Sequence, residues 1–255
     1  MILGFPIHWY GLLYLLAFII AYVSLPRLLR YRSLTLSPDT LSAILSAVVL
    51  GVIVGGRLGY VVFYELPYFV QHPLEIFAVW NGGMSSHGGF LGVTISLWFA
   101  LKKRKVPLLP FLDCMSVPVA LGLAFGRFGN FINLELYGTV TTLPWAISIP
   151  GVEGLRHPTF FYSMAQDLCM ACVCYAMLRS RRFETGQTFA MFLLLYGVLR
   201  FVVEIFRDQP YGYMHLLGIE LSRGQLLTLP IIAIAIVLLV FLQRRSGNGE
   251  TISDQ

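Results

Sequence analysis

The sequence predicts an all-α integral membrane protein, and three observations lead to that class. Of its 255 residues, 57% are hydrophobic and only 12% are charged, whereas a soluble domain has about 25% charged residues. The mean hydropathy is +0.74. The apolar residues also gather in runs close to the roughly 20 residues that a helix needs to cross a bilayer. A water-soluble globule and a disordered chain are therefore both excluded.

Seven apolar runs are expected to cross the membrane, and together they form a single polytopic domain over residues 1–255. In chain order these runs are Trp9–Leu29, Leu41–Tyr64, Phe90–Leu101, Leu108–Phe125, Thr159–Leu178, Thr188–Phe206 and Leu226–Leu242. The third run is short for a span, and the segment before it, Pro73–Gly89, is too rich in glycine for an ordinary helix. Because irregular backbone is tolerated at membrane depth only where protein or a cavity satisfies it, this segment is predicted to be a re-entrant or surface arm.

The basic residues give the expected orientation of these spans. Twelve of the 18 lie in four clusters that fall on one side of the membrane if the spans alternate, and the positive-inside rule places such clusters in the cytoplasm. The prediction is an N-out, C-in protein of a bacterial inner membrane, with a small periplasmic segment at 134–158 and a cytoplasmic tail at 246–255. The same clusters account for the net charge of +5 without a nucleic-acid partner. They are Arg27, Arg30 and Arg32; Lys102 to Lys105; Arg179, Arg181 and Arg182; and Arg244 and Arg245.

All four cysteines fall within predicted spans, at positions 114, 169, 172 and 174. A disulfide framework belongs to small extracellular domains, and a buried cysteine packs as a small apolar residue. The Cys169-x-x-Cys172-x-Cys174 spacing is typical of some metal sites, but only Asp167 is near it as a further ligand. Packing is favoured over metal binding, and neither a metal nor another cofactor is expected.

Ionisable side chains inside the apolar runs are the first candidates for function. A charge at membrane depth costs at least about 2.5–3.5 kcal/mol on insertion scales, so such a residue is expected to be paired or functional. A purely structural pairing across helices stays open for about half of the candidates. The candidates are Arg57, Asp113, Arg127, Asp167, Arg200 and Glu204.

Tyr196, Arg200 and Glu204 are spaced four residues apart, which places them on one face of a helix. Arg200 can then be held from one turn below by Glu204 and from one turn above by the Tyr196 hydroxyl. The planar fork of a held guanidinium suits a phosphate or a carboxylate. A structural Arg–Glu pair explains the same stripe equally well.

A second polar cluster lies at the outer end of the fourth span. Arg127, Asn130, Asn133 and Glu135 bring a fork donor, two amides and a carboxylate together within about two turns. Glycines in this segment, at 126 and 129, let the backbone approach a ligand closely. A simple interfacial cap would not need so many polar groups.

His87 follows a glycine-rich stretch at the outer start of the third span and is flanked by glycine again at 88 and 89. Histidine, with a reference pKa of about 6.5, is the side chain best suited to take up a proton near neutral pH. A lone histidine is more often structural, and four others lie on the outer side.

Together these elements resemble the phosphatidylglycerol:prolipoprotein diacylglyceryl transferase family over nearly the whole chain. The most specific piece is Gly126-Arg127-Phe128-Gly129-Asn130-Phe131-Ile132-Asn133-Leu134-Glu135-Leu136-Tyr137-Gly138, which looks like the family signature. Other matching pieces are His8-Trp9-Tyr10-Gly11, Gly55-Gly56-Arg57-Leu58-Gly59-Tyr60, the glycine-flanked His87, Tyr196-Gly197-x-x-Arg200-x-x-x-Glu204 and Ser222-x-Gly224-Gln225.

The resemblance implies transfer of the sn-1,2-diacylglyceryl group from phosphatidylglycerol to the lipobox cysteine of preprolipoprotein signal peptides. The product is a thioether, and glycerol phosphate is released. Its implied partners are these two substrates and the lipid bilayer, with the active site towards the periplasmic side and no cofactor.

The resemblance also implies roles for individual residues. His87 would act as base for the thiol, while Arg127 and Arg200 clamp the phosphate. Whether His87 or Arg200 activates the thiol stays open. The remaining positions would bind substrate or position the arginines: Tyr10, Arg57, Asn130, Glu135, Gly138, Tyr196 and Glu204.

The match departs from the family before the fifth span, where His157-Pro158-Thr159-Phe160-Phe161-Tyr162-Ser163 lacks the usual Gln and Glu. Asp167, one turn beyond Ser163, is a hypothetical replacement for the missing carboxylate. A divergent paralogue with restricted clients is therefore one alternative. A transporter or channel for an anionic solute is another, because buried arginines beside broken helices are also a transporter device, although the two halves show no internal repeat.

Overall fold

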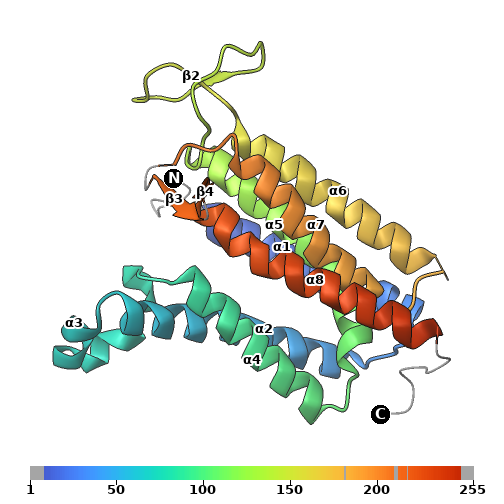
Figure 1. Ribbon diagram of the computed structural model, residues 1–255. Coiled ribbons are helices and arrows are strands. Elements are labelled where there is room, and N and C mark those ends of the chain that lie inside the picture. Colours follow the sequence, from blue (N-terminus) through green and yellow to red (C-terminus); the bar gives the residue numbers. More distant parts are fainter. Residues whose placement is uncertain (1–8, 181, 210–211, 217, 248–255) are drawn as a thin grey trace. The chain divides into compact units, whose positions relative to one another are not determined.

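The computed structural model describes residues 9–180, 182–209, 212–216 and 218–247. His8 of the first motif and almost all of the predicted tail at 246–255 lie outside the described residues. The described chain is mostly helical (Figure 1), with two small antiparallel hairpins: β1 (Ile147–Ser148) with β2 (Leu155–Arg156), and β3 (Tyr213–Leu216) with β4 (Ile219–Ser222). The predicted all-α membrane class agrees with this architecture.

Six helices within the described residues are long and apolar enough to cross a membrane. They are α1 (Trp9–Leu29), α2 (Pro38–Phe63), α5 (Leu108–Ile132), α6 (Thr159–Arg179), α7 (Gln187–Glu204) and α8 (Arg223–Gly247). The third expected span, Phe90–Leu101, corresponds to α4 (Ser86–Lys103), which is not among the six. Its first turn holds a histidine and two glycines and its last turn two lysines, so its apolar stretch is short.

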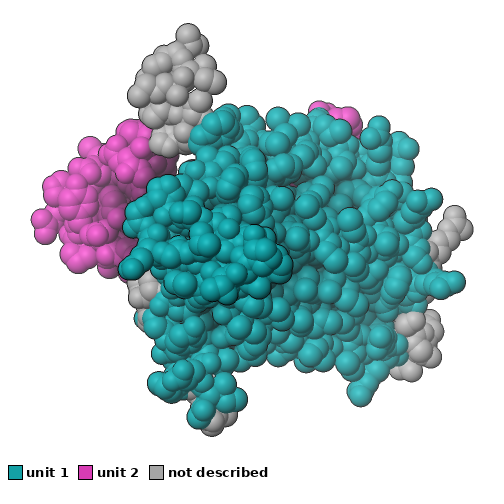
Figure 2. All heavy atoms as spheres, turned by 90° about the horizontal axis from the view of Figure 1, so that it is seen from above, with its two compact units in different colours: residues 1–34, 109–255 teal, residues 35–108 magenta. Residues whose placement is uncertain are grey.

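The chain divides into two compact units, residues 1–34 with 109–255 and residues 35–108, which Figure 2 colours separately. The smaller unit contains α2, α4 and, between them, α3 (Leu66–Gln71), η2 (Pro73–Phe77) and η3 (Val79–Asn81). The predicted arm, Pro73–Gly89, begins with η2 and η3 and ends in the first turn of α4. The Ser37 side chain caps α2 by accepting from the Thr40 N–H, and the Ser85 side chain caps α4 by accepting from the Gly88 N–H.

Glycines let α2 and α4 pack backbone against backbone. A Cβ built at Gly59 would lie 2.7 Å from the Cα of Gly88, and one built at Gly55 would lie 2.7 Å from the Cα of Gly92. The later residue on α2 meets the earlier one on α4, so the helices run antiparallel. Because small residues allow such close approach, the motif glycines of the second span have a packing role.

The larger unit is a bundle of α1, α5, α6, α7 and α8, and Asp113 ties one of its ends together. The fully buried Asp113 carboxylate accepts from Arg32 Nε at 2.7 Å and from the Gly186 and Phe189 N–H groups at 2.8 Å. Arg32 also donates to Thr188 Oγ1 at 3.0 Å. The end of α1 and the starts of α5 and α7 are therefore joined by one satisfied polar cluster.

Replacing Asp113 by alanine is expected to destabilise the protein by about 3–5 kcal/mol, because it leaves the buried Arg32 without its partner. The activity of each correctly folded molecule should stay unchanged. The unfolding temperature in detergent measures the first effect and the turnover number the second. An unchanged unfolding temperature would contradict the structural role of Asp113.

The basic clusters of this unit share the end that Asp113 ties together. The cluster at 27–32 closes α1 beside Asp113, and Arg179 closes α6 just before the 183–184 carbonyls that accept from Arg32. At the end of α8, Leu242 lies beside Gly186 at the start of α7. The opposite end of the bundle carries the ends of α5 and α7.

Candidate active site

Five chain segments meet at that opposite end of the larger unit. The segment after α5 passes between the start of α6 and the end of α7, since the Gly138 N–H donates to the His157 carbonyl at 2.8 Å and the Thr139 N–H donates to the Phe206 carbonyl at 2.9 Å. The first turn of α1 and the first turn of α8 lie at the same end, as the contacts below show. The β1–β2 hairpin projects beyond these helix ends (Figure 1).

Tyr10, Asn130 and Glu135 form a closed hydrogen-bond triangle. The Tyr10 hydroxyl donates to Glu135 Oε1, and Asn130 Nδ2 donates both to the Tyr10 hydroxyl and, at 3.2 Å, to Glu135 Oε1. The backbone on either side of Glu135 is strained, because Leu134 and Leu136 have φ of 53° and 58°. Such strain is concentrated at functional sites. The structure thus brings together three of the predicted site residues.

Two of the predicted arginines are each held by a buried carboxylate. Arg127 Nε lies 3.7 Å from Asp167 Oδ2, and Arg200 Nη2 lies 3.7 Å from Glu204 Oε2. The predicted support of Arg200 by Glu204 is therefore present. The predicted support by Tyr196 is absent, because among the described residues no hydrogen bond joins the Tyr196 hydroxyl to Arg200. The Tyr196 ring instead stacks on Phe192.

Arg207 is a third arginine of this cluster, and the sequence analysis did not single it out. Its Nη1 lies 3.2 Å from Glu204 Oε2. Burial lowers the pKa of Arg207, and the positive charges of Arg200 and Arg127 act in the same direction, while Glu204 raises it. Arg207 is thus close enough to the other two guanidinium groups to be repelled by both. The sequence contained one sign of this contact: Arg207 follows Glu204 by three residues, a spacing at which side chains on a helix can form an ion pair.

Glu204 is the acceptor around which this cluster is built. Its side chain is buried, and Gln209 Nε2 donates to its Oε1 at 3.2 Å. Gly224, in the first turn of α8, leaves room for it, because a Cβ there would lie 2.5 Å from the Glu204 carboxyl carbon. This contact explains the glycine of the Ser222-x-Gly224-Gln225 motif in steric terms.

Gly138, the last residue of the signature segment, lies where no side chain fits. A Cβ at this position would lie 2.5 Å from His157 Cβ and 2.9 Å from the His157 carbonyl oxygen, and would also clash with the Phe206 carbonyl. Two of these neighbours are backbone atoms that cannot turn away. The glycine keeps the segment after α5 in contact with its neighbours and so keeps Glu135 in place.

The variant Gly138→Ala is therefore expected to lose at least about 100-fold in turnover, since misplacement by about 1 Å at a reaction site can cost that much. Gly122→Ala is the matched control, because a Cβ at Gly122 would make only an ordinary contact, at 3.4 Å from Ala17 Cβ, outside the signature segment. Steady-state rates of the two purified variants test the expectation. Equal rates would show that the clash at Gly138 relaxes without harm.

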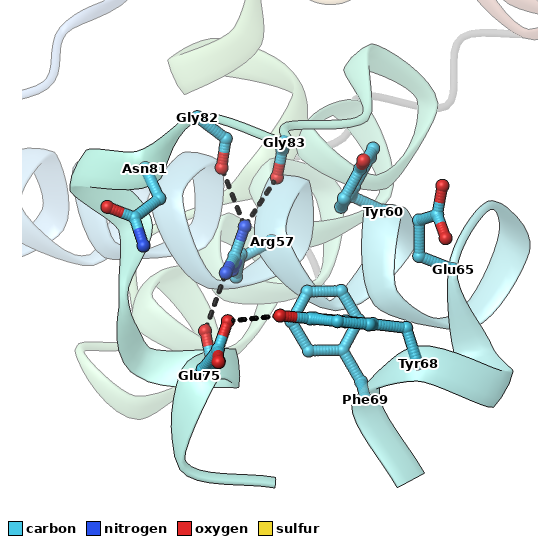
Figure 3. Close-up of a pocket in the computed structure, with 9 residues that line it drawn as sticks. All are labelled: Arg57, Tyr60, Glu65, Tyr68, Phe69, Glu75, Asn81, Gly82 and Gly83. Atoms are coloured by element: carbon cyan, nitrogen blue, oxygen red, sulfur yellow. Dashed lines mark hydrogen bonds between the residues drawn. The ribbon is translucent and has the colours of Figure 1, made fainter. Parts of the chain in front are cut away.

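Arg57, in the smaller unit, anchors the arm in this structure. Its guanidinium donates to the backbone carbonyls of Gly82 at 2.6 Å, Gly83 at 3.1 Å and Glu75 at 2.6 Å (Figure 3). It also donates to the Ile76 carbonyl at 2.9 Å. It also lies 5.0 Å above the Phe69 ring. These bonds use four of the five N–H donors of an arginine side chain. The predicted role of Arg57 in binding substrate stays a prediction.

A cavity of about 270 Å³ opens beside Arg57 (Figure 3). On its wall the Tyr68 hydroxyl donates to Glu75 Oε2 at 2.8 Å, and this bond raises the pKa of Tyr68. This hydrogen bond therefore links α3 to η2. The lining residues are Arg57, Tyr60, Glu65, Tyr68, Phe69, Glu75, Asn81, Gly82 and Gly83.

His87 also belongs to the smaller unit, where it lies in the first turn of α4 with an exposed side chain. Its neighbour Gly88 packs directly on α2, so the position of the backbone at His87 is fixed. Its role as a base stays a prediction.

The four cysteines are free thiols, with Cys114 and Cys174 buried and Cys169 and Cys172 exposed. Within the described ranges no group of three His, Cys, Asp or Glu side chains is placed to hold a metal ion. The arginine cluster itself presents guanidinium, carboxylate and amide groups.

A multi-pass bundle of apolar helices with three arginines gathered at one end defines a membrane protein that can bind an anionic group there. Comparison with known proteins narrows this class. The model of the prolipoprotein diacylglyceryl transferase family matches residues 1–241.

Three relatives named phosphatidylglycerol–prolipoprotein diacylglyceryl transferase cover almost the same length. The chain is 42% identical to the protein of Geobacter sulfurreducens, with 93% of this chain and 92% of that one covered. It is 43% identical to the protein of Polynucleobacter asymbioticus, with 92% of each covered. It is 40% identical to the protein of Neisseria gonorrhoeae, with 91% and 90% covered. The chain belongs to the prolipoprotein diacylglyceryl transferase family, and the resemblance found in its sequence is confirmed.

Proposed function

We propose that this chain transfers the sn-1,2-diacylglyceryl group of phosphatidylglycerol to the lipobox cysteine of preprolipoprotein signal peptides. The observation that carries the proposal is the gathering of Arg127, Arg200 and Arg207 at one end of the bundle, in a chain of this family. The phosphodiester of the lipid carries a single negative charge, and the guanidinium groups of such a cluster can bind it.

The reaction needs a nucleophile at one side of the reacting carbon and a stabilised leaving group at the other. The cysteine sulfur forms a bond to the sn-3 carbon of the lipid, and the bond from that carbon to the phosphate oxygen breaks. The bonding pair leaves with glycerol phosphate, whose phosphate gains a negative charge. Arg127 and Arg200 stabilise this charge as it develops, since donors fixed in advance cost no reorganisation during the reaction.

The thiol must lose its proton, because a cysteine of reference pKa about 8.5 attacks as the thiolate. We propose that His87 accepts the proton that the thiol loses. Imidazole takes up a proton near neutral pH, whereas a guanidinium stays protonated in proteins and cannot act as a base.

Tyr10, Asn130 and Glu135 bind the head group, and Glu204 holds Arg200 and Arg207 in place. Hydrogen-bond triangles of this kind orient polar side chains because each member fixes the next. Gly138 keeps their segment in position, and Tyr196 lies one turn before Arg200 on the same helix face.

The site faces the periplasm in this proposal, in an N-out, C-in protein of a bacterial inner membrane with α4 as a seventh, short span. The supporting observation is that the basic clusters of the larger unit share the end opposite Arg127 and Arg200, as the positive-inside rule requires. Alkaline phosphatase, which is active only in the periplasm, should be active when fused after residue 150 and inactive when fused after residue 105. The reverse pattern would contradict this orientation.

A direct assay tests the function. Purified protein in detergent is mixed with phosphatidylglycerol and a synthetic lipobox peptide, and the peptide mass is followed. An added diacylglyceryl mass with release of glycerol phosphate supports the proposal. A peptide whose cysteine is replaced by serine is the matched control and should stay unmodified. No mass change with the wild-type protein would refute the function.

A further inference from the structure

Asp167 is a buried charge that the proposed reaction does not use. It lies in the middle of α6 with no exposed surface. The Gln166 side chain lies close to the carboxylate, but no hydrogen bond of normal geometry joins either carboxylate oxygen to a described residue. The neighbouring Gln166 Oε1 is buried without a hydrogen bond in the same part of the described chain. The charged groups near Asp167 are Arg127, at 3.7 Å, and Arg200, which is within electrostatic range.

Asp113 shows what a structural buried carboxylate looks like in the same unit. It is equally buried, yet it accepts three bonds of 2.7 to 2.8 Å from Arg32 and two backbone N–H groups. Burying an ionised carboxylate costs stability unless such bonds replace its water. Asp167 lacks them, so its burial is poorly compensated. A side chain kept at a cost in stability points to a contribution to function.

The exposed fractions place Asp167 beneath the arginines. The Asp167 side chain is 0% exposed, the Arg127 side chain 14% and the Arg200 side chain 22%. Asp167 therefore lies deeper in the bundle, and the guanidinium groups lie nearer its surface. A charge in this place attracts both arginines from the inside of the bundle.

We infer that Asp167 is a positioning residue that holds Arg127 and Arg200 in the arrangement that receives the phosphate. Arg207 is repelled by both Arg127 and Arg200, and of these three arginines only Arg200 and Arg207 form an ion pair with Glu204 in the described part of the chain. Arg127 depends on Asp167 for a buried carboxylate. Without it, Arg127 moves away from the other two guanidinium groups, and the three no longer converge on one phosphate.

The inference rests on the proposed function, and the kinetic constants separate it from a simple charge effect. In Asp167→Asn the cluster becomes more positive, so it should bind phosphatidylglycerol at least as tightly as the wild type does. Stabilisation of the leaving phosphate depends on the directions of the guanidinium groups, so the loss should appear in kcat. We expect kcat to fall on the order of 100-fold, with KM for phosphatidylglycerol unchanged or lower.

Asp113→Asn is the matched control, because it removes the same charge from an equally buried aspartate outside the site. It should lower Tm clearly and leave kcat per folded molecule unchanged, whereas Asp167→Asn should lower kcat and leave Tm near the wild-type value. An Asp167→Asn enzyme with wild-type kcat would overturn the inference, and so would a kcat loss that merely follows the fraction unfolded. If the wild-type protein itself transfers nothing from phosphatidylglycerol, the proposed function has failed instead.

Discussion

Replacing Arg127 by alanine is expected to lower kcat by about 10³-fold, because removing one fixed donor to a developing charge typically costs 10²–10³-fold and a phosphate clamp stands at the upper end. The variant loses one of the two guanidinium groups assigned to the phosphate and leaves Asp167 buried without its nearest cation. Transfer of diacylglyceryl to a lipobox peptide from phosphatidylglycerol measures the effect.

The variant Arg127→Lys shows whether the site needs the planar guanidinium group or only its positive charge. Lysine keeps the positive charge but lacks the planar fork that binds a phosphate through two parallel bonds, so we expect it to recover only a small part of the lost rate. Arg27→Ala is the control, because Arg27 is an exposed arginine near the other end of the bundle, and its rate should equal the wild-type rate. Full activity in Arg127→Lys would show that the site needs charge alone.

Replacing His87 by alanine is expected to lower kcat/KM by 10²–10⁴-fold at neutral pH, the usual contribution of a general base. The lost rate should return in part as the pH rises above about 8.5, because the thiol of the substrate then ionises without a base. The wild-type profile should change less over the same range. Initial rates from pH 6 to pH 10, roughly spanning both ionisations, test this.

His215→Ala is the matched control for this variant. His215 is an exposed histidine on β3, 3.7 Å from Glu220, and its removal should leave the pH profile unchanged. A His87→Ala enzyme whose rate stays low at every pH would contradict the role of a base. It would favour a role in binding the peptide.

Much of the fold could be predicted from the sequence, because the cost of placing polar groups in lipid acts within each apolar run. The expected span at Leu108–Phe125 became α5 (Leu108–Ile132), and the span at Thr159–Leu178 became α6 (Thr159–Arg179). The prediction of a span was weakest for the third apolar run, Phe90–Leu101. Its polar ends leave α4 outside the six helices that meet the criteria for a span.

The candidate site could be predicted where its residues lie close together in the sequence. Asn130 and Glu135 were found from one segment, and Arg200 with Glu204 from one helix face. Among the described residues no hydrogen bond joins Tyr196 to Arg200, because helical spacing shows which side chains share a face but not which way each side chain turns. Arg57 was found as a buried charge, but its four carbonyl partners come from η2 and from the two glycines after η3, which no periodicity in the sequence marks as partners.

The membrane class, most of the helices and the family signature with its arginine, asparagine and glutamate follow from the sequence. Which distant residues share one site follows from the packing of the helices. It joined Arg207 to Glu204 and Arg200, placed Tyr10 on Glu135 across the bundle, and left Asp167 beneath Arg127 without a hydrogen bond. The reason is physical. Helix periodicity and hydropathy act over a few turns of one segment, whereas these contacts depend on how separate helices pack and which polar groups that packing leaves unpaired.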